Sequence, residues 1–99
     1  MNIVVTGSSK GIGKAIAEKF SGLGNQVFIT ARNEDELSKT ANIITEKNGG
    51  IVIKFFAADL SDKNETTKFA GWLLNQIDTI DILINNTGQF LPGSVYNEE

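Results

Sequence analysis

Short runs of β-branched and aromatic residues alternate along the chain with longer segments in which apolar residues recur every three or four positions. The short runs predict four buried strands, at residues 3–6, 27–30, 51–58 and 81–86. Lys54 interrupts the apolar sequence of the third run. Because a charged side chain is tolerated best on an outer strand, we expect the third strand near the edge of the sheet.

Three amphipathic helices are predicted between these strands. The first covers about residues 11–23. Asn33 and Glu36 have capping-box spacing at the start of the second helix, and Ser61 or Asp62 opens the third. The apolar residues expected on the inner faces are Ile12, Ile16, Phe20 and Leu23 in the first helix, Leu37, Ala41 and Ile44 in the second, and Phe69, Trp72, Leu73, Ile77 and Ile80 in the third.

The strict alternation of strands and helices predicts an α/β fold. We expect a Rossmann-type, doubly wound parallel sheet with the element pattern β-α-β-α-β-α-β, right-handed crossovers and strand order 3-2-1-4. The length of 99 residues allows one domain, residues 1–99. Residues 89–99 are expected to form a loop leading to a helix that the sequence does not contain.

The first strand runs into a glycine-rich turn, Thr6-Gly7-Ser8-Ser9-Lys10-Gly11-Ile12-Gly13, which opens the first helix. Glycines let the backbone approach a bulky group, and the helix N-terminus presents unpaired N–H groups and a positive dipole end. This context predicts a phosphate-binding turn; the alternative is a plain strand-to-helix connection. A P-loop is excluded because five residues separate Gly7 from Gly13-Lys14, and Ala15 has no hydroxyl for magnesium.

Polar residues also follow the other three strands. Ala31-Arg32 come after the second strand, Asp59 after the third and Asn85-Asn86 after the fourth. The carboxyl ends of parallel strands meet at one edge, and doubly wound sheets bind ligands there, where the strand order reverses. The sequence therefore predicts a nucleotide site on this rim, between the first and fourth strands.

Two cations favour NADP(H) over NAD(H) as this nucleotide. A carboxylate after the second strand would hold the ribose of NAD, but this chain has Arg32 there, with Lys10 in the facing turn. Each charge-assisted contact to a 2′-phosphate is worth about 1.5–3 kcal/mol. Glu34 and Asp35 follow closely, but they fall at a helix start and suit its dipole. The alternative for Arg32 is an exposed surface charge.

The composition narrows the possible chemistry. The chain has no Cys and no His, which excludes disulfides, thiol nucleophiles, Ser-His-Asp triads and the common zinc sites. Any chemistry of this chain alone would rest on carboxylates, hydroxyls, Lys or Arg side chains, or a bound cofactor, and we predict no metal ligand within it. The net charge of −3 gives no electrostatic reason to expect nucleic acid or an anionic membrane as a partner.

No apolar run reaches the roughly 18 residues of a membrane span, and the first strand follows Met1 directly, so we expect a cytoplasmic location.

Four motifs, in order, resemble those of the short-chain dehydrogenase/reductase family: Thr6-Gly7-x-x-x-Gly11-Ile12-Gly13, Ala31-Arg32-Asn33, Asp59-Leu60 and Asn85-Asn86-Thr87-Gly88. The likeness covers all 99 residues and is to the classical NADP(H)-dependent subgroup that includes 3-oxoacyl-carrier-protein reductases. It implies an oxidoreductase that transfers a hydride between the cofactor and a carbonyl or alcohol. The implied cofactor-binding residues are Gly7, Gly11, Ile12 and Gly13 at the pyrophosphate, Ser9, Lys10, Arg32 and Asn33 near the adenosine ribose and its 2′-phosphate, Asp59 and Leu60 at the adenine, and Asn86 and Gly88 near the ribose at the cofactor's middle.

Some of these residues also suit structural roles. Asp59 suits a helix cap or a turn, and Asn85 and Asn86 suit the closing of backbone hydrogen bonds at a strand end. Thr87 departs from the family's usual Ala, a step in size that we do not expect to abolish binding.

The family's catalysts lie beyond the stretch matched here. They are a Ser, a Tyr-x-x-x-Lys pair and an Asn, and Tyr96 is not that Tyr because only three residues follow it and none is Lys. We therefore expect a truncated, cofactor-binding domain that is inactive alone, with the small carbonyl or alcohol substrate bound only by a full-length parent. The alternatives are a complete, non-catalytic dinucleotide-binding or sensing module, and an interaction fragment without a cofactor. We expect self-association through the exposed edge of the fourth strand or through a sheet face that lacks helices.

Overall fold

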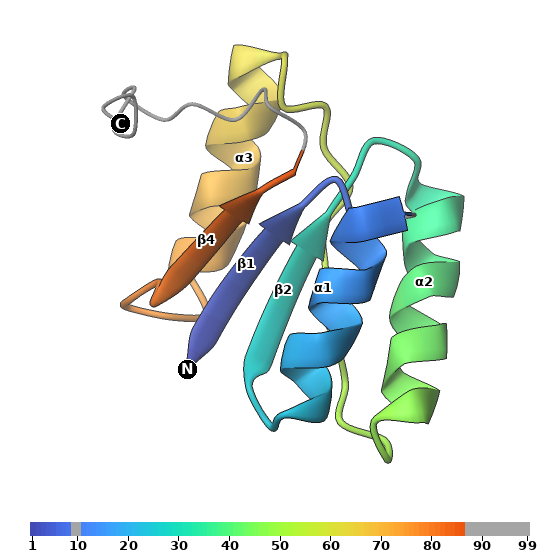
Figure 1. Cartoon of the computed structure of the whole chain (residues 1–99). Coiled ribbons are helices and arrows are strands. Elements are labelled where there is room, and N and C mark those ends of the chain that lie inside the picture. The colour runs from blue at the N-terminus through green and yellow to red at the C-terminus, as the bar shows by residue number, and fades with distance from the viewer. Residues whose placement is uncertain (9–10, 87–99) are drawn as a thin grey trace.

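The computed structural model describes residues 1–8 and 11–86, in which strands and helices alternate along the chain (Figure 1). The sheet has the order β3-β2-β1-β4, and its neighbouring strands are parallel. None of the helices described is long and apolar enough to cross a membrane. The predicted fold and strand order are confirmed, whereas the loop expected at residues 89–99 lies outside the described residues. The elements are β1 (Asn2–Thr6), α1 (Gly11–Gly22), β2 (Gln26–Thr30), α2 (Glu34–Lys47), β3 (Lys54–Phe55), α3 (Lys63–Leu74) and β4 (Ile82–Asn85).

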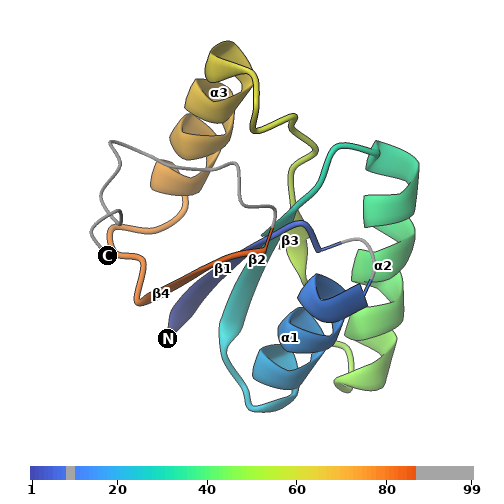
Figure 2. The same ribbon diagram turned by 45° about the horizontal axis from the view of Figure 1, so that its top comes forward.

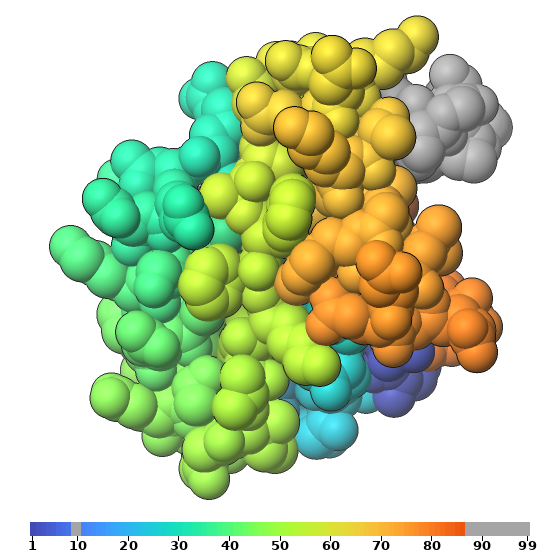
Figure 3. Space-filling view, turned by 180° about the vertical axis from the view of Figure 1, so that it is seen from behind, coloured from blue at the N-terminus to red at the C-terminus, as the bar shows by residue number. Residues whose placement is uncertain are grey.

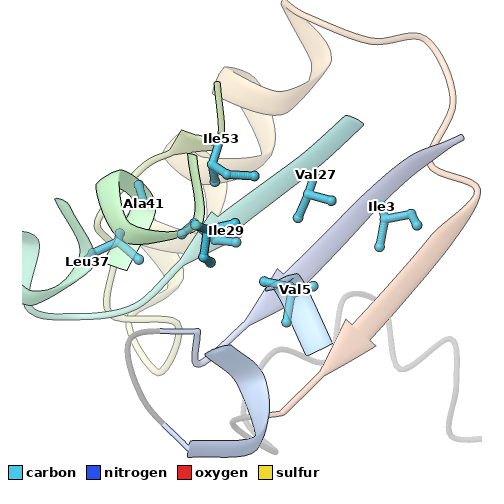
Figure 4. Close-up of a cluster of buried hydrophobic side chains, with 9 residues drawn as sticks. Ile3, Val5, Val27, Ile29, Leu37, Ala41 and Ile53 are labelled. Carbon is cyan, nitrogen blue, oxygen red and sulfur yellow. The ribbon is translucent and has the colours of Figure 1, made fainter. Parts of the chain in front are cut away.

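Helices cover both faces of the sheet, α1 and α2 on one and α3 on the other (Figures 1 and 2). Side chains alternate along β1 accordingly: Ile3 and Val5 belong to the core under α1 and α2, and Val4 to the core under α3. The expectation of a face without helices is wrong, because Phe69 and Leu73 of α3 pack over the second face. Figure 4 labels residues of the first core: Ile3, Val5, Val27, Ile29, Leu37, Ala41 and Ile53.

Helix α1 packs on the sheet through small residues rather than through the predicted apolar stripe. Ile12 is 69% exposed and Leu23 is 66% exposed, so their assignment to the inner face is wrong. Small side chains let the helix pack closely. The buried residues each lie one position after the large apolar residues predicted for the inner face. The buried residues of α1 are Gly13, Ala17 and Ser21, and the partly buried Ile16 and Phe20 pack against the first core.

Side-chain caps fix the starts of the other two helices. Oδ1 of Asn33 accepts a hydrogen bond of 3.0 Å from the N–H of Glu36, as the capping-box spacing predicted. Oδ1 of Asp62 accepts hydrogen bonds from the N–H groups of Asn64 at 2.8 Å and Glu65 at 3.3 Å. Of the two openings considered for α3, Asp62 is therefore the cap.

The inner face of α3 is aromatic and aliphatic, largely as predicted. Phe69 and Leu73 are buried, and Trp72 meets Phe28 of β2 edge-on, with ring centroids 5.9 Å apart. Seen from behind, α3 (yellow to orange) lies over this face beside the segment around β3 (yellow-green; Figure 3). Ile80 comes after the end of the helix and is 40% exposed, so its place on the inner face is wrong.

Strand β3 is much shorter than the predicted strand at 51–58, although it occupies the edge of the sheet as expected. The chain still runs beside β2 after the strand ends. The N–H of Phe56 donates to the carbonyl oxygen of Ile29 at 3.2 Å, and that of Ala58 to Ala31 at 3.0 Å. These bonds carry the segment after β3 to the carboxyl edge of the sheet.

Candidate functional site

The carboxyl ends of the strands lie level at one edge of the sheet, the upper ends of the arrows in Figure 1. The parallel register pairs Thr6 of β1 with Thr30 of β2 and with Asn85 of β4. The segment after β3 reaches the same edge. The predicted rim is thus present in the described residues. It is formed by residues 6–8 and 11–13 of the glycine turn, Ala31-Arg32, Asp59 and Asn85-Asn86.

The turn after β1 depends on two glycines in left-handed backbone conformation. Gly7 has φ 65° and Gly11 has φ 63°, values that glycine adopts at little cost. The N–H of Ser8 donates to the carbonyl oxygen of Thr30 at 3.2 Å, and its buried hydroxyl donates to that of Val5 at 2.6 Å. The turn is therefore anchored to the ends of β1 and β2.

Gly13 lies where α1 comes closest to the strand ends. A Cβ on Gly13 would overlap the carbonyl oxygen of Gly7 and would lie 2.9 Å from Nδ2 of Asn86. In the described part of the chain, nothing lies within 4 Å of a Cβ built on Gly11. Gly13 is thus required for packing, whereas Gly11 leaves its backbone open to an approaching ligand.

The start of α1 differs from the starts of the other two described helices. The first turn of α1 contains no acidic residue, whereas that of α2 holds Glu34, Asp35 and Glu36, and that of α3 holds Glu65. A helix N-terminus carries roughly half a positive charge, which a nearby carboxylate offsets. The N-terminus of α1, with Ile12 exposed beside it, is therefore suited to an external anion.

Thr6 joins the ends of β1 and β4. Its hydroxyl donates to Oδ1 of Asn85 at 3.0 Å and accepts from the N–H of Asn86 at 3.0 Å. The side-chain amide of Asn86 donates to the carbonyl oxygen of Gly7 at 3.2 Å. Asn86 thus has the strand-end role considered for it, since its side chain bonds the backbone of the glycine turn, whereas the side chain of Asn85 bonds the hydroxyl of Thr6. Thr6 was not predicted to form this link; the signal in the sequence is a hydroxyl residue at the end of a strand, directly before Gly7.

Arg32 and Asn33 are exposed where the chain leaves β2. Oδ1 of Asn33 is engaged in capping α2. The guanidinium of Arg32 lies near enough to Asp59 to contribute to a lowered pKa of that carboxyl. Arg32 therefore adds positive charge to the rim.

Asp59 is half-buried and strongly hydrogen-bonded. Its Oδ1 accepts from the hydroxyl of Ser61 at 2.6 Å and from the Ser61 N–H at 3.0 Å, and its own N–H donates to Oε1 of Glu65 at 2.7 Å. The Ser61 hydroxyl, then the Ser61 N–H and the charge of Arg32, lower the pKa of Asp59 against the opposing effect of burial. Asp59 is therefore an ionised acceptor, with Leu60 buried beside it. These contacts of Ser61 and Glu65 with Asp59 were not predicted from the sequence.

The described rim combines an open glycine turn, a helix start without its own acid, a cation and an ionised carboxylate. Such a set can bind a ligand that carries both phosphate and a hydrogen-bond donor. Ser9, Lys10 and Gly88 lie outside the described residues. The predicted site residues that the structure brings to this rim are Gly7, Gly11, Ile12, Gly13, Arg32, Asn33, Asp59, Leu60 and Asn86.

A family model described as short chain dehydrogenase matches residues 1–98. The chain belongs to the short-chain dehydrogenase family. An uncharacterized oxidoreductase of Bacillus subtilis strain 168, YxbG, is 40% identical over 95 residues, which make up 96% of this chain and 34% of YxbG. The chain therefore spans about a third of the length of this relative.

Solved structures of oxidoreductases share the fold. YwfH, an NADPH-dependent reductase involved in bacilysin biosynthesis, aligns with a TM-score of 0.81 and 32% identity over 86% of this chain and 34% of its own. L-Sorbose reductase from Gluconobacter frateurii, in complex with NADPH and L-sorbose, aligns with a TM-score of 0.79 and 34% identity over 86% of this chain and 32% of its own. The resemblance to short-chain dehydrogenases is confirmed; the narrower likeness to 3-oxoacyl-carrier-protein reductases is only approximate.

Proposed function

We propose that these residues form the cofactor-binding portion of an NADP(H)-dependent short-chain oxidoreductase, which transfers a hydride between the nicotinamide and a small carbonyl or alcohol. The observation that carries this proposal is the N-terminus of α1, lined by glycine and free of acidic residues in its first turn, at the point where the strand order reverses. Doubly wound sheets bind nucleotides at that point. The NADPH named for YwfH and L-sorbose reductase supports a nicotinamide dinucleotide.

The pyrophosphate fits the glycine turn. Gly11 leaves space above its backbone, and Gly13 lets α1 start close to the end of β1. Backbone N–H groups in the first turn of a helix can bind phosphate oxygens without any side chain. We therefore assign the pyrophosphate to Gly7, Gly11, Ile12 and Gly13, and the ribose at the cofactor's middle to Asn86 and Gly88.

The adenosine fits the other half of the rim, between the ends of β2 and β3. Asp59 offers an ionised acceptor to the adenine amino group, beside the buried side chain of Leu60. Arg32 offers a cation to the 2′-phosphate, and Ser9, Lys10 and Asn33 are assigned to the same phosphate and ribose. NAD-binding sheets carry a carboxylate after the second strand, and this chain has Arg32 there. This cation supports NADP(H) over NAD(H) as the cofactor.

When bound, the cofactor supplies or accepts the hydride of the reaction. The residues of this chain bind and orient its adenosine and pyrophosphate. The Tyr-x-x-x-Lys pair that the family resemblance implies is not in the sequence, since the one Tyr, Tyr96, is followed by Asn97-Glu98-Glu99. We therefore expect cofactor binding without turnover from these 99 residues alone.

The test is a calorimetric titration of NADPH and NADH into the wild-type chain and two variants. Arg32→Ala should weaken NADPH binding about tenfold to a hundredfold, the worth of one charge-assisted contact, and leave NADH binding unchanged. Lys19→Ala removes an exposed cation from the last turn of α1 and should change neither affinity. Unchanged NADPH binding in Arg32→Ala would contradict the preference for NADP(H). A wild-type chain that binds neither dinucleotide would contradict the function itself.

A further inference from the structure

Asp59 is held more firmly than a turn residue requires, by two residues that the proposed site does not include. We propose that Ser61 and Glu65 are positioning residues, which aim the carboxylate of Asp59 at the 6-amino group of adenine. The inference rests on the proposed cofactor site and adds to it the residues that set selectivity for the base.

Ser61 engages only one of the two carboxylate oxygens. Its hydroxyl and its N–H both donate to Oδ1, at 2.6 Å and 3.0 Å. Within residues 1–8 and 11–86, no hydrogen bond reaches Oδ2 of Asp59. A carboxylate oxygen offers about two acceptor sites, so Oδ1 is fully used. The carboxylate is thereby locked in one orientation, with Oδ2 as its open acceptor.

Glu65 fixes the backbone from which this carboxylate projects. The N–H of Asp59 donates to Oε1 of Glu65 at 2.7 Å, and its carbonyl oxygen accepts from the N–H of Asp62 at 3.0 Å. Asp62 in turn caps α3 by accepting from the N–H of Glu65. Because Asp62 provides the cap, the structure does not need Asp59 for that purpose. The network instead leaves Asp59 with a defined position and one unused oxygen.

The open oxygen suits a donor and disfavours an acceptor. An ionised carboxylate can only accept hydrogen bonds, and the 6-amino group of adenine donates them. Hypoxanthine carries an oxygen at the same position, and a carboxylate aimed at that oxygen would repel it. The hydrogen bonds from Ser61, and to a lesser extent the charge of Arg32 after β2, lower the pKa of Asp59, and the acidic residues bonded to its backbone are Glu65 and Asp62 at the start of α3. A fixed Asp59 should therefore prefer NADPH over reduced nicotinamide hypoxanthine dinucleotide phosphate.

The first experiment compares these two dinucleotides by calorimetry on the wild-type chain and on variants at Ser61. Ser61→Ala leaves only the backbone N–H of residue 61 to hold Oδ1, and should reduce the preference for NADPH about fivefold, the effect of one hydrogen bond. Ser61→Thr keeps both hydrogen-bond donors and should show the same preference for NADPH as the wild type. Thr67→Ala is the matched control, because its hydroxyl bonds to the carbonyl oxygen of Lys63 within α3 and should be dispensable for the preference.

A second pair of variants tests Glu65 independently, and decides the matter should Ser61→Ala fail to fold. Glu65→Gln keeps an oxygen acceptor for the N–H of Asp59 and should preserve the preference for adenine. Glu65→Ala removes the acceptor and should reduce the preference. If Ser61→Ala or Glu65→Ala weakens both dinucleotides equally, or changes neither, the positioning role is refuted while cofactor binding stands. If the wild-type chain binds neither dinucleotide, the proposed function fails, and this inference fails with it.

Discussion

The side-chain amide of Asn86 donates a 3.2 Å hydrogen bond to the carbonyl oxygen of Gly7, the same oxygen that a Cβ on Gly13 would overlap. The ends of β1 and β4 and the start of α1 therefore meet at one point. The shape of the glycine turn depends on this contact across 79 positions as well as on its own residues. Sequence motifs at opposite ends of the described chain are in this way parts of one structural unit.

Gly13→Ala should destabilise the protein through this junction. The added methyl group would overlap the backbone of Gly7. Overpacking of this kind lowers the free energy of unfolding by about 1–3 kcal/mol. Gly71→Ala is the matched control, because nothing described lies within 4 Å of a Cβ at that position in α3. Replacing a helical Gly by Ala there should stabilise the chain by about 0.5–1 kcal/mol. Urea unfolding measures both changes, and equal effects would contradict the packing argument.

Much of the fold follows from local sequence, because caps and alternation act over short distances. Asn33 caps α2 at the predicted residue, and the parallel sheet follows from the strict alternation of strands and helices. The inner face of α1 was misjudged at Ile12 because large apolar residues were counted, whereas Gly13 and its small neighbours decide how closely the helix packs. The spacing of hydrophobic residues along the sequence does not predict how closely a helix approaches the sheet.

In the candidate site, the residues of the motifs were predicted, whereas the residues that support them were not. Motif spacing brought the glycine turn, Asp59 and Asn86 to one rim, because parallel strands place their carboxyl ends together. The residues that hold this rim were missed, since Thr6, Ser61 and Glu65 act through hydrogen bonds between segments or across a turn. Ser and Glu are frequent in any helix start, so their type alone did not distinguish a role toward a neighbouring carboxylate.

The lowered pKa of Asp59 predicts a loss of stability in acid. Its folded pKa lies below the ordinary value of 3.8, so the ionised form is favoured by folding. The contribution of Asp59 is complete above the ordinary value and is lost as the pH falls through the lowered one. The difference in unfolding free energy between wild type and Asp59→Asn should therefore shrink as the pH falls below about 5.

Ser61→Ala provides the internal comparison for this measurement. Removing the hydroxyl takes away the largest cause of the lowered pKa, so the loss of stability in acid should be smaller in Ser61→Ala and should level off at a higher pH than in the wild type. Urea titrations at a series of pH values report both variants. A difference between wild type and Asp59→Asn that stays constant in acid would show that the carboxylate is not favoured by folding.

The edge of β4 should promote self-association. In the described residues, β4 pairs with β1 alone, and its residues Ile82, Leu83 and Ile84 are only half-buried. An apolar strand edge with no charge on it is a template for pairing with another chain. We expect the sedimentation coefficient to rise with protein concentration. Ile82→Lys should shift the chain toward the monomer, whereas Val52→Lys, at an exposed position before β3, should not. A monomer at every concentration would contradict this prediction.

Asn33 allows capping and cofactor recognition to be separated at a single residue. Asn33→Ala removes the acceptor for the N–H of Glu36 and should lower the free energy of unfolding by about 1 kcal/mol. Asn33→Asp keeps a capping oxygen, so its stability should stay near that of the wild type, but it places a negative charge beside Arg32. NADPH affinity should then fall while NADH affinity changes little, because only NADPH carries the 2′-phosphate. If Asn33→Asp binds NADPH as tightly as the wild type, Asn33 caps α2 without lying near that phosphate.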